Sequence, residues 1–184
     1  CGFHVIFVST HLPAFLEDHL LPAWVAGWAL ALIGLFNILG TLMYGYLGDS
    51  YSKKNLLTGL YSLRSVLFFV FFLSPKTEFT VLIFASLLGI LWLSTVPLTS
   101  GIITDVFGPK YTSMLFGMAL FTHNIGSFFG SWLGGRIFDT YGSYDLMWII
   151  CVFVGFASAA VHFPINGSAI LRIQPQGLKV SRAE

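Results

Sequence analysis

Six long apolar stretches, separated by short polar segments, dominate this sequence. Hydrophobic residues make up 56% of the 184 residues and charged residues only 9%, whereas soluble domains carry about 25% charged residues. Each stretch approaches the roughly 20 residues that an α-helix needs to cross a bilayer. The sequence therefore predicts an all-α membrane protein with six transmembrane helices and the lipid bilayer as its main partner. The expected spans are residues 1–16, 22–47, 55–73, 79–104, 112–138 and 145–165.

The first and second halves of this pattern repeat each other weakly at an offset of ninety residues. The matching residues are Gly27, Ala29, Leu30, Gly40, Gly45 and Asp49 in the first half and Gly117, Ala119, Leu120, Gly130, Gly135 and Asp139 in the second. An odd number of spans per unit inserts the second unit upside down, as in the inverted repeats of secondary transporters. We therefore expect two inverted three-helix repeats.

Basic residues gather on one side of the predicted membrane. Lys53 and Lys54 lie between the second and third spans, Lys110 lies between the fourth and fifth, and three more basic residues lie in the tail. Because cytoplasmic loops are rich in Lys and Arg, we expect these loops and the C-terminus in the cytoplasm, in a plasma or inner membrane. The predicted domains are an N-terminally truncated transmembrane unit, residues 1–165, and a polar tail, residues 166–184.

Several large function classes lack support in the sequence. It has no basic stripe with interleaved aromatic residues, which would indicate a nucleic-acid partner. Its cysteines and histidines lack the spacing of metal ligands, and it has no nucleotide-binding fingerprint or Ser-His-Asp set. We therefore expect a protein that is not an enzyme and that needs neither a metal nor another cofactor.

The loop after the second span resembles the cytoplasmic-loop signature of the major facilitator superfamily, roughly G-x-L-[GA]-D-x-x-x-x-[RK]-[RK]. Residues 45–54 read GYLGDSYSKK. The matching residues are Gly45, Leu47, Gly48, Asp49, Lys53 and Lys54. The resemblance implies one six-span half of a twelve-span transporter, in which the charges of such loops act as a cytoplasmic gate.

The fifth span and the loop after it indicate which half of the twelve-span transporter the chain resembles. Residues 115–117, 123–130 and 134–139 resemble the eleventh span and following loop of bacterial carboxylate-type permeases. The resemblance implies spans seven to twelve, nearest the monocarboxylate and oxalate–formate antiporter group, with a missing N-terminal six-span half as partner. It also implies transport of a small organic solute by alternating access, with a carboxylate solute and proton coupling as open options. Members of that group often carry a basic residue in the eighth span, and residues 22–48 contain no Lys or Arg.

Polar residues at membrane depth are costly and are therefore candidates for function. His11 in the first span is a candidate for proton coupling, because histidine titrates near neutral pH. His123 and Asn124 lie in the middle of the fifth span, and Asn37 lies at the matching depth of the second. For His11, the competing interpretation is a hydrogen bond near Pro13.

The fourth span offers a second group of candidates. Trp92, Thr95 and Thr99 share one face of a continuous helix at spacings of three and four residues. Pro97 is expected to bend this helix by leaving a carbonyl without a partner. A bent helix with hydroxyl groups and a tryptophan suits a small polar solute, and the competing interpretation is ordinary helix packing.

Two further features have both a functional and a structural interpretation. Arg64 lies deep in the third span, where it either binds an anionic solute or braces the fourth span. Gly126, Gly130 and Gly134 form a small-xxx-small ladder that lets two helix backbones approach closely. The alternative function for the chain is a non-transporting membrane scaffold that uses this ladder for assembly. A membrane enzyme ranks behind both.

Overall fold

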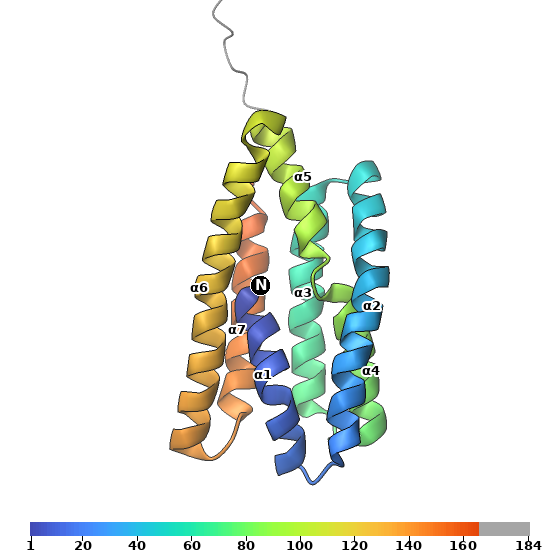
Figure 1. Cartoon of the computed structure of the whole chain (residues 1–184), viewed down its shortest axis with the longest axis vertical. Coiled ribbons are helices and arrows are strands. Elements are labelled where there is room, and N and C mark those ends of the chain that lie inside the picture. The colour runs from blue at the N-terminus through green and yellow to red at the C-terminus, as the bar shows by residue number, and fades with distance from the viewer. Residues whose placement is uncertain (166–184) are drawn as a thin grey trace, which may run out of the picture.

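The computed structural model describes residues 1–165, which form a bundle of long helices (Figure 1). The polar tail predicted over residues 166–184 lies outside the described residues. The helices are α1 (Gly2–Asp18), α2 (Ala23–Ser50), α3 (Lys53–Leu73), α4 (Glu78–Leu91), α5 (Thr95–Phe107), α6 (Pro109–Tyr141) and α7 (Asp145–His162).

Four of the apolar helical stretches have the length and hydropathy of a membrane span. They are α2, α3, α4 taken together with α5, and α7. With 17 residues α1 is shorter than these, and α6 is long enough but more polar. The described structure is therefore helical and suited to a membrane, as the sequence predicts.

Successive helices run in opposite directions along the bundle, except that α5 continues in the direction of α4 (Figure 1). The connections α2–α3 and α5–α6 lie at one end, and the connections α1–α2, α3–α4 and α6–α7 lie at the other. As a result α1 runs opposite to α4 and α5, α2 runs opposite to α6, and α3 runs opposite to α7. The most extensive contacts between helices are those of α3 with α7, α2 with α4, and α1 with α6.

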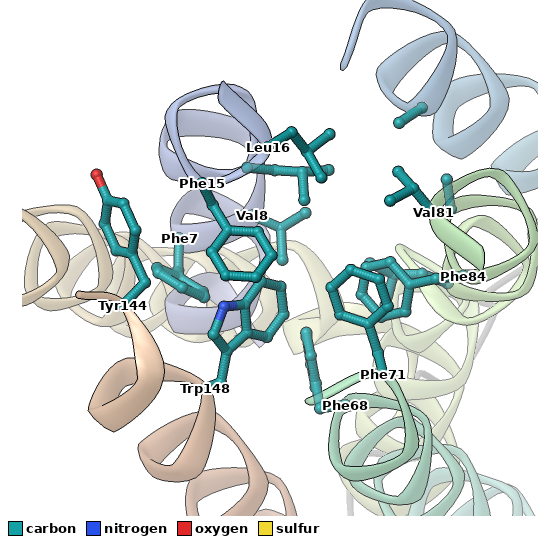
Figure 2. Packing of buried hydrophobic residues seen from close by; sticks show 14 of the residues in the cluster. Phe7, Val8, Phe15, Leu16, Phe68, Phe71, Val81, Phe84, Tyr144 and Trp148 are labelled. Atoms are coloured by element: carbon teal, nitrogen blue, oxygen red, sulfur yellow. The ribbon is translucent and has the colours of Figure 1, made fainter. Parts of the chain in front are cut away.

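An aromatic cluster joins α1, α3, α4 and α7 toward the end of the bundle where α3 ends and α7 begins. Trp148 of α7 is fully buried, and Phe7 and Phe15 of α1 each lie 5.1 Å from it between ring centroids (Figure 2). Phe71 of α3 lies 5.2 Å from Trp148 and stacks on Phe84 of α4 at 3.9 Å. These edge and stacked contacts are favourable arrangements of aromatic rings, and they hold helices from both halves of the sequence in one core.

Glycines bring α1 and α6 into close backbone contact. A Cβ atom at Gly130 of α6 would lie 3.0 Å from the Cα atom of Phe3, and one at Gly2 of α1 would lie 2.9 Å from the carbonyl carbon of His123. Real Cβ atoms almost never approach other atoms so closely, so a larger residue would push the helices apart. Gly134 and Gly126 continue this contact against His11 and Phe3.

The contact between α2 and α4 repeats this arrangement residue by residue. A Cβ atom at Gly40 of α2 would lie 2.7 Å from the Cα atom of Ile90, and one at Gly89 of α4 would lie 2.8 Å from the carbonyl oxygen of Ile33. Gly40 and Ile33 precede Gly130 and His123 by ninety residues. Gly89 and Ile90 follow Gly2 and Phe3 by 87 residues. The weak sequence repeat thus coincides with two equivalent helix contacts.

The fourth expected span differs from its prediction. Residues 92–94 interrupt it, so α4 and α5 are separate helices rather than one helix that bends at Pro97. Pro97 lies in the first turn of α5, where a missing N–H costs little. The carbonyl of Leu93, which Pro97 was expected to free, accepts a hydrogen bond of 2.9 Å from the Val96 amide. The prediction of a continuous helix with a proline bend was therefore wrong.

Candidate functional site

Three of the predicted site residues line a cleft of about 270 Å³ between α5 and α6. Thr95 and Thr99 contribute hydroxyl groups from α5, and His123 contributes an imidazole from α6. Cys1 also lines the cleft, with its Sγ atom 3.5 Å from the Thr95 hydroxyl oxygen. Asn124 follows His123 but is exposed on α6, outside this lining. The structure thus brings together part of the predicted set.

Tyr61 of α3 and His162 of α7 line the same cleft, although the sequence analysis did not select them. Their ring centroids lie 5.1 Å apart, and the His162 Nδ1 atom lies 2.7 Å from the Ser158 carbonyl oxygen. A signal was available for Tyr61, which precedes Arg64 by three residues and therefore shares a helix face with it.

Three further candidates, on α2, on α3 and in the interruption itself, meet between α4 and α5. Arg64 is fully buried and donates from Nη2 to the carbonyl oxygens of Leu91 and Trp92, the second at 2.6 Å. Asn37 accepts from the Leu93 amide at 3.0 Å through Oδ1. Trp92, Arg64 and Asn37 therefore form a second group, separate from the lining of the cleft.

The charges of the described residues are unevenly distributed with depth. Every aspartate and glutamate among residues 1–165 lies within three residues of a helix end. Arg64 instead lies in the interior of α3. Hydroxyl and imidazole groups both donate and accept hydrogen bonds. The middle of this bundle therefore offers neutral polar groups and one buried cation, a combination that suits a polar or anionic solute.

His11 lies apart from both groups, at the contact of α1 with α6 and α7. Its Nε2 atom lies 2.9 Å from the Ser131 carbonyl oxygen, which can only accept, so Nε2 carries the hydrogen. Its Nδ1 atom lies 3.3 Å from the Tyr144 hydroxyl. Tyr144 precedes α7, and burial raises the pKa of its hydroxyl, which Asp18 and Asp139 raise further. The Tyr144 hydroxyl therefore stays protonated and can donate a hydrogen bond to Nδ1 of His11.

The loop motif contributes an ion pair between α3 and α5. Lys53, the first residue of α3, donates to the Asp105 carboxylate at 2.8 Å. The Lys53 side chain passes over Gly101, where a Cβ atom would lie 2.6 Å from its Cε atom. Gly48 lies similarly close to Leu98 of α5, and Asp49 is exposed. The remaining motif residues are Gly45, Leu47 and Lys54, all at the same end of the bundle.

These features can be compared with those of known proteins. The family model described as Major Facilitator Superfamily matches residues 2–180. The chain belongs to the major facilitator superfamily. Two curated relatives agree with this assignment.

One relative is an uncharacterized MFS-type transporter, YcxA, of Bacillus subtilis (strain 168). It is 27% identical over 165 residues, which are 86% of this chain and 40% of that protein. The other is a Na(+), Li(+), K(+)/H(+) antiporter of Planococcus maritimus, 26% identical over 135 residues, which are 70% of this chain and 31% of that protein. The chain thus spans well under half the length of either relative. As a member of the superfamily, it is an integral membrane protein of a transporter family.

Proposed function

We propose that this chain is the C-terminal half, spans seven to twelve, of a twelve-span secondary transporter. In this proposal α4 and α5 form one span, so that six spans arise from two inverted three-helix repeats. The matching contacts of Gly130 with Phe3 and of Gly40 with Ile90 support this arrangement, because a two-fold relation between the triplets exchanges them. The opposite directions of corresponding helices support it as well.

The proposal includes a missing N-terminal six-span half, which would border the solute path from the other side. The fraction of each relative that the chain covers supports this.

The proposed substrate is a small organic solute that is neutral or anionic, with a carboxylate as the first candidate. The observation that carries this choice is Arg64, which is fully buried in α3 while the described carboxylates stay at helix ends. A positive charge in a region of low dielectric attracts anions over several ångströms. Thr95, Thr99 and His123 are the proposed solute contacts.

The proposed orientation places the α2–α3 and α5–α6 connections in the cytoplasm. Lys53, Lys54 and Lys110 lie at that end, and this basic charge supports a cytoplasmic location. Lys53 and Asp105 would then act as a cytoplasmic gate that forms and breaks with the cavity. The tail would lie on the same side.

Uptake by the full-length parent in proteoliposomes tests this function. The probes are radiolabelled monocarboxylates and dicarboxylates, supplied with and without an inward proton gradient. We expect uptake of at least one probe, and we expect His123→Gln to reduce it severalfold, whereas His19→Gln at the exposed α1–α2 turn leaves it unchanged. Uptake that is insensitive to His123→Gln and to Thr99→Val would contradict the assigned contacts. Lack of uptake of every probe would contradict the solute class.

Proton coupling is a further part of the proposal, with His11 and His123 as the candidates. Histidine can change charge near neutral pH, and His11 already has a donor and an acceptor in place. Loss of the dependence of uptake on the proton gradient in His11→Gln would support coupling through this residue. If uptake by His11→Gln and by His123→Gln depends on the proton gradient as strongly as uptake by the unmodified protein, coupling through these residues is contradicted.

Exchange of monovalent cations for protons is a second candidate, favoured by the similarity to the Planococcus maritimus antiporter. The same proteoliposomes, loaded with a pH-sensitive dye, report it after addition of Na⁺, Li⁺ or K⁺. A cation-dependent pH change without carboxylate uptake would favour this candidate over the first. Because the carboxylates described here lie at helix ends, the cation would then bind mainly in the other half.

A further inference from the structure

The interruption between α4 and α5 leaves backbone groups without their usual helical partners. The α4 helix ends at Leu91 and α5 begins at Thr95, and the Trp92 amide turns back to the Gly89 carbonyl at 3.0 Å. Helix ends expose carbonyl and amide groups, and within a bilayer no water is available to satisfy them. Such an interruption therefore persists only where other groups supply the hydrogen bonds.

Arg64 of α3 supplies the donors. Its Nη2 atom donates to the adjacent carbonyls of Leu91 and Trp92, and its Nη1 atom lies 3.4 Å from the Cys1 sulfur. The guanidinium has a planar set of donors, which suits two neighbouring acceptors. Its charge is also favourable near the negative end of the α4 dipole. Arg64 thus stabilises the end of α4 from another helix.

Asn37 of α2 supplies the acceptor. Its Oδ1 atom accepts from the Leu93 amide at 3.0 Å, and Thr41, one turn later, donates to the same oxygen at 3.4 Å. Ser94 donates to the Ile90 carbonyl at 2.6 Å, so one more carbonyl is satisfied from within the interruption. Two neighbouring helices therefore support the interruption from two sides, with groups of opposite hydrogen-bonding character.

The equivalent part of α1 shows that helix packing alone does not require an interruption. Gly2 of α1 and Gly89 of α4 make matching contacts and are 87 residues apart. With this offset, residues 91–94 correspond to residues 4–7. These residues lie within α1, which is continuous from Gly2 to Asp18. The same close contact with a neighbouring helix is thus compatible with an unbroken helix. The interruption coincides with Arg64 and Asn37 instead.

We propose that Arg64 and Asn37 are positioning residues that maintain the interruption as a hinge, about which α5 turns as a rigid segment while α4 stays against α2. The other end of α5 is tied to α3 by Lys53 and Asp105. Because Thr95 and Thr99 lie on α5, its angle sets their distance from His123 across the cleft. This consequence rests on the proposed transport function, whereas the hinge itself does not.

The distance between the two ends of the broken helix tests the hinge directly. Spin labels replace the exposed residues Phe79 and Phe107 in the full-length parent in liposomes, with the other cysteines removed. A straight helix would separate these Cα atoms by about 42 Å. We expect a shorter, narrow distance distribution in the otherwise unmodified protein. We expect Arg64→Met and Asn37→Ala to lengthen or broaden it, and Arg64→Lys to restore it in part.

A matched control and a second variant keep this test decisive. Leu63→Met changes the neighbour of Arg64 on the exposed side of α3 and should leave the distance unchanged. If Arg64→Met fails to fold, Asn37→Ala decides the outcome. An unchanged distance in the folded variants would overturn the hinge.

Uptake measurements on the same variants separate this inference from the proposed function. We expect the initial rate of carboxylate uptake to fall at least roughly tenfold in Asn37→Ala, because misplaced contact groups impair function strongly. Altered distances with a parental uptake rate would overturn the positioning role. Altered distances in a protein that carries none of the probes would support the hinge and contradict the proposed function.

Discussion

In the proposed inverted repeat, the helix α1 and the pair α4–α5 occupy equivalent places, yet only the second is interrupted. Both contact their neighbour through a glycine on each helix. In one case Gly2 packs against His123 and Gly130 against Phe3, and in the other Gly89 packs against Ile33 and Gly40 against Ile90. The difference lies in the side chains of other helices that reach the backbone. The comparison teaches that glycines determine how closely two helices pack, whereas buried polar groups nearby determine whether a helix is continuous.

The largest effects are expected where the two halves agree. Gly40→Ala and Gly130→Ala each place a Cβ atom against backbone that cannot move independently. Overpacking of this kind costs about 1–3 kcal/mol, so we expect both variants to lower the thermal unfolding temperature clearly in detergent. Gly34→Ala and Gly117→Ala are matched controls in the same helices, because a Cβ atom there meets nothing within 4 Å. A large loss of thermal stability in only one of Gly40→Ala and Gly130→Ala would contradict the equivalence of the two helix contacts.

A second effect, confined to one half, is expected where the two halves differ. Asn37 and Ser127 correspond at the ninety-residue offset, but Asn37 accepts from α4–α5 whereas Ser127 donates to the His123 carbonyl of its own helix. Leaving a buried amide unsatisfied costs about 1–3 kcal/mol. Asn37→Ala should therefore destabilise the protein by about that amount, and Ser127→Ala should do so much less. Equal losses in thermal stability would show that the support at the interruption is not specific to the second half.

The smallest effect is expected at the ends of the two helices. Asp105 pairs with Lys53, and its counterpart by the 87-residue offset, Asp18, is exposed. Exposed ion pairs contribute about 0–1 kcal/mol, so Asp105→Asn should lower stability slightly and Asp18→Asn less. The double variant Lys53→Asp with Asp105→Lys exchanges the two charges and should recover the stability that Asp105→Asn loses. A result in which Asp18→Asn costs more than Asp105→Asn would contradict this assignment.

The helices and their order could be predicted from the sequence because long apolar stretches have few alternatives in a bilayer. The interruption at residues 92–94 could not, since it depends on Arg64 and Asn37, which are distant in sequence. The proline signal pointed to Pro97, but proline in a first helical turn needs no bend. The common face assigned to Trp92, Thr95 and Thr99 assumed a continuous helix. Thr95 and Thr99 line the cleft, while the backbone of Trp92 bonds to Arg64.

Other polar residues were placed by contacts that spacing does not reveal. His4 and His11 share a face of α1, yet His4 contacts the Cys151 carbonyl of α7 and His11 contacts the Ser131 carbonyl of α6. Both helices lie more than a hundred residues away in sequence. His162 likewise lines the cleft because α7 packs beside helices that are distant in sequence. Residue type and depth identified polar candidates, and only the packing of helices from both halves grouped them.

The sidedness of the connecting loops tests the central claim, two inverted triplets across one membrane, most directly. Single cysteines replace Lys54, Lys110 and Lys76 in the full-length parent, which is exposed to a membrane-impermeant maleimide in right-side-out and inside-out vesicles. We predict that Lys54→Cys and Lys110→Cys react from the same side and that Lys76→Cys reacts from the opposite side. Reaction of Lys54→Cys and Lys110→Cys from opposite sides would contradict the account.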